Sequence, residues 1–167
     1  MAQLEALGNV VASKGKIVHI KPHGAMYNQA AKNIDLADAI VDAITDFNKD
    51  LILLALSGSQ MIDSAKAKGV KYASEVFADR AYEADGSLRA RSLENSMITD
   101  EDLAVERVIK MVKTGKVTAY TGEEIDIEAH SVCVHGDSEK AFVFVQKLNE
   151  AFSKNGIETV GLIEAIK

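Results

Sequence analysis

Two histidines and an aspartate follow segments of the chain that are predicted to be strands. His23 and His135 are each followed by glycine, and Asp79 stands at the end of a third predicted strand. A histidine there can serve as a base, a proton shuttle or a metal ligand, and a carboxylate can orient it or bind the metal. The alternative for the histidines is hydrogen bonding within loops. The alternatives for Asp79 are an ion pair with Arg80 and the capping of a nearby helix. We take His23, Asp79 and His135 as candidate catalytic residues.

Four charged residues near the same strand ends are candidate substrate contacts. Lys21, Arg80 and Arg91 can hold a carboxylate or phosphate, the arginines through their planar guanidinium groups. The alternative for each cation is a solvated place on the surface. Asp137 can contact substrate, cap the following helix, or do both.

Other reactive residue types in the sequence carry less specific signals. Cys133 lies in an apolar segment and is expected in the core rather than as a nucleophile. It is the only cysteine, which excludes an internal disulfide and fits a reducing cytoplasm. His19 and His130 lie further inside their strands and are expected to pack or to support other residues. No HExxH, paired CxxC, GxSxG or phosphate-loop motif occurs, so the sequence offers no recognised ATP site of its own.

The elements that must position these residues alternate between strand and helix patterns. The apolar run 51–56 is typical of a strand buried on both faces, and residues 34–48 form an amphipathic helix with Asn33 or Asp35 as its cap. This order predicts an α/β fold with a mainly parallel sheet, in which ligands meet the carboxyl ends of the strands. No change of composition marks a linker, so residues 1–167 are expected to form a single domain. Further strands are predicted at 16–21, 72–78 and 126–134, and further helices at 2–13, 59–68, about 99–113 and 138–154.

Length, charge and hydropathy exclude several classes of protein. The chain has 167 residues, whereas a complete (β/α)8 barrel typically needs about 250. Its net charge of −6 and lack of a basic block argue against a nucleic-acid surface. The longest apolar run, 51–56, is far below the roughly 20 residues of a membrane-spanning helix, and no secretory signal is visible. We expect a cytoplasmic protein.

Three sequence blocks resemble the LamB/YcsF lactam-utilisation family, whose best-known members are A subunits of bacterial ATP-dependent 5-oxoprolinase. The blocks are KPHGAMYN at 21–28, FADRAY at 77–82 followed by DGSL at 85–88 and by Arg91, and SVCVHGD at 131–137. The resemblance implies an irregular (β/α) barrel of the glycoside hydrolase/deacetylase type, here partial.

The resemblance also implies a reaction, namely opening of the 5-oxoproline lactam to L-glutamate, coupled to ATP hydrolysis and carried out with separate B and C subunits. Phosphorylation of the lactam carbonyl oxygen would activate it for attack by water. In this hypothesis Lys21, Arg80 or Arg91 neutralises anionic oxygens. His23, Asp79 or His135 activates the water. The identity of any metal stays open.

Family members normally begin with a further N-terminal block, holding segments like Asp-Leu-Asn-Cys-Asp and Cys-Gly-Phe-His-Ala-Gly-Asp, which this sequence lacks. Its absence is expected to expose a sheet edge and apolar surface and so to favour a homo-oligomer. Two other functions stay open: a catalytically incomplete small-anion binding or interaction module, and a metal enzyme like the polysaccharide deacetylases.

Overall fold

The computed structural model describes residues 2–11, 15–136 and 141–167. The chain divides into two compact units, Met1–Ala73 and Ser74–Lys167. Four strands form a sheet in the order β1-β2-β3-β6, and β4 and β5 form a separate two-stranded sheet. The parallel pairings of β1 with β2 and of β3 with β6 are those expected of an α/β fold.

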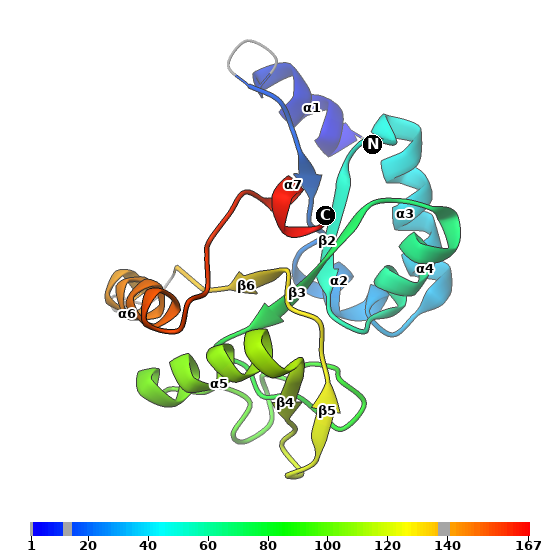
Figure 1. The fold of residues 1–167 in the computed structure, drawn as a ribbon. Coiled ribbons are helices and arrows are strands. Elements are labelled where there is room, and N and C mark those ends of the chain that lie inside the picture. The colour runs from blue at the N-terminus through cyan, green and yellow to red at the C-terminus, as the bar shows by residue number, and fades with distance from the viewer. Residues whose placement is uncertain (1, 12–14, 137–140) are drawn as a thin grey trace. The chain divides into compact units, whose positions relative to one another are not determined.

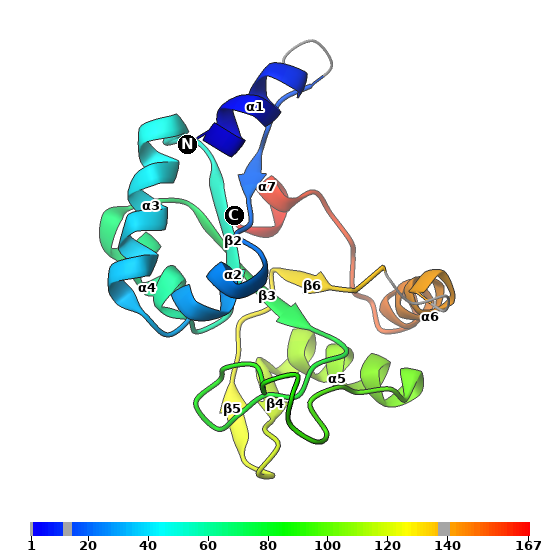
Figure 2. The same ribbon diagram turned by 180° about the vertical axis from the view of Figure 1, so that it is seen from behind.

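The first unit is built around β2, whose five residues are all buried, as the apolar run 51–56 predicts. In the parallel pair with β1, His19 lies opposite Ile52. Helices α3 and α4 lie side by side in both views and contribute the buried Val41, Ile44 and Met61 (Figures 1 and 2). The elements of the first unit are α1 Ala2–Val11, β1 His19–Ile20, α2 Gly24–Ala30, α3 Ile34–Asn48, β2 Ile52–Leu56, α4 Gln60–Lys68 and the start of β3 Tyr72–Phe77.

Polar residues and glycines set the helix ends in this unit. Asn33, one of the two caps that the sequence allows for α3, accepts a hydrogen bond from the backbone N of Leu36 at 3.0 Å. Gly69 ends α4 with φ of 68°, a left-handed conformation that costs glycine little. The sequence did not predict α2, which follows His23, and β1 is shorter than the strand predicted at 16–21.

The second unit holds the parallel pair of β3 and β6, in which Phe77 lies opposite Cys133. The strand predicted at 126–134 is divided: β5 ends at Asp126 and β6 begins at Ser131. Between them, the backbone N of Ile127 donates to Gly115 O, and that of His130 donates to Ser74 O. The residues between β5 and β6 therefore bond to two different segments of the chain, and the predicted strand is interrupted there. The elements are α5 Glu101–Thr114, β4 Lys116–Thr118, β5 Glu124–Asp126, β6 Ser131–Cys133, α6 Ala141–Lys154 and α7 Leu162–Ala165.

Among the described residues, no helix is both long enough and apolar enough to span a bilayer.

Tyr82 lies in the core of the second unit and forms a hydrogen bond with the last residue of β3. The side chain is fully buried, and its hydroxyl accepts a hydrogen bond from the backbone N of Phe77 at 2.8 Å. Burial raises the pKa of this phenol, so the hydroxyl stays protonated. Tyr82→Phe removes the acceptor, and we expect it to lower the free energy of unfolding by about 1–3 kcal/mol in a urea titration.

Tyr120 supplies the matched control for that substitution. Its ring is about half exposed and lies 3.6 Å from the guanidinium carbon of Arg89, a contact that phenylalanine preserves. Tyr120→Phe should change the free energy of unfolding by less than about 0.5 kcal/mol. Equal stability of the two variants would show that the buried hydrogen bond contributes nothing.

Candidate functional site

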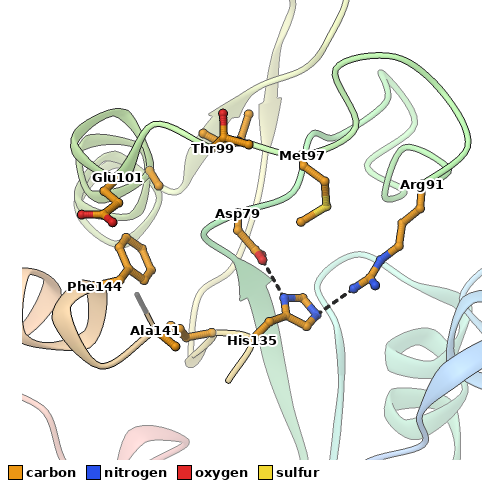
Figure 3. Close-up of a pocket in the computed structure, with 11 residues that line it drawn as sticks. Asp79, Arg91, Met97, Thr99, Glu101, His135, Ala141 and Phe144 are labelled. Atoms are coloured by element: carbon orange, nitrogen blue, oxygen red, sulfur yellow. Dashed lines mark hydrogen bonds and ion pairs between the residues drawn. The ribbon is translucent and has the colours of Figure 1, made fainter. Parts of the chain in front are cut away.

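The parallel pairing of β3 and β6 brings Asp79 and His135 together. Phe77 and Cys133 lie opposite each other in register, and each candidate residue stands two positions further along its strand direction. Because β3 ends at Phe77 and β6 ends at Cys133, the two strands bring both candidate residues to the same edge of the sheet. His135 Nδ1 lies 2.6 Å from Asp79 Oδ2 (Figure 3). The structure thus joins two of the three predicted catalytic residues.

Arg91 completes a chain of three side chains. Its Nη2 lies 3.1 Å from His135 Nε2, on the side of the imidazole away from Asp79 (Figure 3). A guanidinium group only donates, so Nε2 must accept, and the ring proton then sits on Nδ1 and is donated to Asp79. His135 is therefore neutral in this arrangement, with the lone pair of a general base on Nε2.

The Asp79–His135 pair is partly shielded from solvent. The side chains of Asp79 and His135 are 22% and 28% exposed, and the Phe77 ring centroid lies 6.0 Å from that of His135. Asp79 Oδ1 is buried and has no hydrogen-bond partner among the described residues. A buried carboxylate oxygen without a donor is costly, so this atom is an open acceptor for a ligand N–H or O–H group.

A cavity of about 320 Å³ adjoins this pair. Phe144 and Ala141 lie on one side of the Asp79–His135 pair and Arg91 on the other, with Thr99 and Glu101 also on the wall (Figure 3). A ligand in this cavity therefore meets a base, a carboxylate oxygen and a cation within one unit of the fold. That combination suits hydrolysis of a carbonyl compound, in which water must lose a proton and anionic oxygen must be held.

Arg80, a predicted substrate contact, lies in the interior. It is 6% exposed, and its Nη2 donates to the carbonyl of Arg89 at 2.6 Å. Burial, and next the positive charge of Arg91, lower the pKa of this guanidinium. The bond to Arg89 fixes the loop between β3 and α5, and a substrate role for Arg80 stays a prediction.

The remaining predicted site residues are Lys21, His23 and Asp137. Lys21 and His23 belong to the first unit. Lys21 Nζ lies 5.7 Å from the ring centroid of Tyr27. The exposed His23 occupies the N-cap position of α2, but its side chain makes no capping hydrogen bond. Asp137 falls outside the described residues. The roles predicted for these three residues stay predictions.

The remaining histidines and the cysteine have other surroundings. His130 Nδ1 accepts a hydrogen bond from the backbone N of Ser74 at 3.0 Å, so this side chain is bonded to the backbone of β3. His19 is exposed on β1, and Cys133 is half-buried rather than fully in the core. In the described part of the chain, no group of three or more His, Cys, Asp or Glu side chains is placed to hold a metal.

Sequence reasoning missed the apolar wall of the cavity. Met97 lies in an irregular segment and Phe144 on an amphipathic helix, where an apolar residue is expected to face the core. No local signal in the sequence separates a core residue from one that lines a cavity.

Comparison with known proteins places these features in a family context. The LamB/YcsF family pattern matches residues 1–167. Two similar curated proteins are the 5-oxoprolinase A subunit of Clostridium beijerinckii, 52% identical over 161 residues, and that of Campylobacter jejuni, 51% identical over 161 residues. Each alignment covers 96% of this chain and 63% of the relative, so this chain spans under two thirds of their length.

A solved structure shows the same fold. The crystal structure of a lactam utilization protein from Thermus thermophilus matches with a TM-score of 0.84 and 34% sequence identity. The match covers 94% of this chain and 63% of that chain. This likeness confirms the expected fold class.

Proposed function

Because the chain belongs to the LamB/YcsF family, we propose that it acts as the A-subunit component of an ATP-dependent 5-oxoprolinase, opening the lactam of 5-oxoproline to L-glutamate. The names of its curated relatives describe an A subunit, which implies partner subunits. We assign B and C subunits as those partners, with ATP used in the assembled enzyme to activate the lactam. The observation that carries the proposal is the chain of hydrogen bonds from Asp79 through His135 to Arg91.

His135 is the general base of the proposed reaction. Nε2 takes a proton from water as the water oxygen bonds to the lactam carbonyl carbon. Asp79 holds the Nδ1 proton at 2.6 Å and stabilises the imidazolium as it forms. The carbon–nitrogen bond of the ring then breaks, and the nitrogen takes the proton held by the His135 imidazolium to become the amino group. With the carbonyl oxygen phosphorylated by ATP, this cleavage leaves an acyl phosphate, which a second water hydrolyses to glutamate and inorganic phosphate.

Arg91 couples substrate binding to the availability of this base. In the structure its Nη2 occupies the Nε2 lone pair that must accept the water proton. The carboxylate of 5-oxoproline is a stronger acceptor than a neutral imidazole and can bind the guanidinium through two oxygens. Since Arg91 is exposed, the side chain can turn toward the substrate and leave Nε2 to water.

Reconstitution tests this function. The chain is combined with B and C subunits, 5-oxoproline and ATP, and glutamate is quantified, with omission of ATP and of the chain as controls. The full-length A subunit of Clostridium beijerinckii, with its own B and C subunits, serves as the positive control. We expect glutamate that depends on both the chain and ATP. Binding of 5-oxoproline without glutamate, while the full-length relative is active, would contradict the enzyme proposal and favour a small-anion binding module.

A further inference from the structure

One wall of the cavity lies across the Asp79–His135 pair from Arg91, and this wall is mostly apolar. Glu101, the charged residue on this wall, pairs its Oε2 with Lys147 Nζ at 2.9 Å, and the same ammonium group lies 3.1 Å from Asp102 Oδ1. The apolar lining comes from the segment before α5, from α5 itself, from the end of β6 and from α6: Met97, Ile98, Ala104, Val134, Ala141 and Phe144.

This apolar wall is open to a ligand. Met97 is 38% exposed even though its side chain borders the cavity, whereas Phe144 is nearly buried and provides a firm surface. In Figure 3 Phe144 and Ala141 face the Asp79–His135 pair from the side opposite Arg91. A ligand with a polar edge at His135 can therefore extend carbon atoms toward Phe144, away from the cation.

The size and charge of the cavity restrict what that ligand can be. A volume of about 320 Å³ lies at the lower end of the roughly 300–1,000 Å³ of drug-sized ligand sites, whereas 5-oxoproline is small and polar. Asp79 Oδ1 can accept a hydrogen bond from a ligand, so it favours a ligand with an N–H group beside it. It disfavours a ligand that places a carboxylate there. An amide N–H beside apolar carbon matches both features.

We infer that the residues Met97, Ile98 and Phe144 form a subsite for the methylene carbons of a lactam, so that the cavity binds uncharged lactams more tightly as their rings grow. The choice of an amide rests on the proposed function. The apolar subsite rests on the lining of the cavity. Binding of such a lactam requires neither ATP nor the carboxylate that Arg91 would hold.

A homologous series of lactams tests this inference by binding alone. Dissociation constants for 2-pyrrolidinone, 2-piperidone and ε-caprolactam are measured by NMR titration of the whole chain, with 5-oxoproline titrated in parallel. Each buried methylene contributes about 0.8 kcal/mol, so affinity should rise about fourfold per added carbon. An affinity that stays level or falls along the series would overturn the inference.

Substitutions in and next to the cavity show which residues contact the methylene carbons. Phe144→Ala should reduce the gain per methylene, whereas Phe142→Ala, on the same helix but 72% exposed and outside the cavity lining, should keep it. Met97→Ser, at a partly exposed position, provides the same test if Phe144→Ala does not fold, and an unchanged gain in Met97→Ser would then contradict the inference. These binding results are independent of glutamate formation. If glutamate forms but lactam affinity does not rise with ring size, the proposed function stands and the subsite is contradicted. If lactam affinity rises with ring size but no glutamate forms, the subsite stands and the proposed function is contradicted.

Discussion

His135→Ala is expected to lower kcat for glutamate formation by about 10²- to 10⁴-fold in the reconstituted enzyme. The substitution removes the Nε2 lone pair that would take the proton from water and leaves Asp79 without its imidazole. Alanine at a position 28% exposed on its side chain opens no closed core cavity, so the fold should be retained. Circular dichroism and steady-state kinetics, measured on the same preparation, check both expectations.

His19→Ala is the matched control for that loss. His19 is exposed on β1 and forms no part of the Asp79–His135 pair, so kcat should stay at the wild-type value. Loss of activity in both variants would indicate a general effect of removing a histidine. Wild-type kcat in His135→Ala would exclude this residue as the base.

Arg91→Gln is expected to raise KM for 5-oxoproline by about 10- to 100-fold. The guanidinium would bind the substrate carboxylate through charge-assisted hydrogen bonds, which contribute about 1.5–3 kcal/mol. The loss in kcat should be smaller than the rise in KM, because Asp79 and His135 stay in place. Initial rates over a range of 5-oxoproline concentrations separate the two parameters.

Arg91→Lys shows whether charge alone suffices at this position. Lysine keeps the cation but lacks the planar pair of donors, so its KM should fall between those of the wild type and Arg91→Gln. A KM that stays unchanged in both variants would remove Arg91 from substrate binding.

The elements of the first unit follow closely from local sequence patterns. The helical spacing of apolar residues predicted α3 over the same residues, 34–48, that the structure shows, and Asn33 is its cap. The apolar run at 51–56 became a strand with both faces buried. These patterns succeed because one element buries one continuous set of residues. The seven-residue α2 offers too few turns for such a pattern to emerge.

The pairing of Asp79 with His135 could be anticipated only in outline. Each residue follows a predicted strand, and parallel strands present their carboxyl ends at one edge of a sheet. The actual neighbours depend on strand register, since Phe77 must lie opposite Cys133 for the two side chains to meet. Arg91 approaches His135 from a loop 44 residues earlier in the chain, and its path is set by bonds such as that from Arg80 to Arg89 O. No sequence period encodes that approach.

The central claim is that Asp79 and His135 work as one unit in lactam opening. The measurement that tests it most directly is kcat for glutamate formation in Asp79→Asn, His135→Ala and the double variant, each reconstituted with B and C subunits. Residues that act together lose activity together, so we predict that the double variant is no slower than His135→Ala alone. Losses that multiply in the double variant, or glutamate formation at the wild-type rate in all three, would contradict the account.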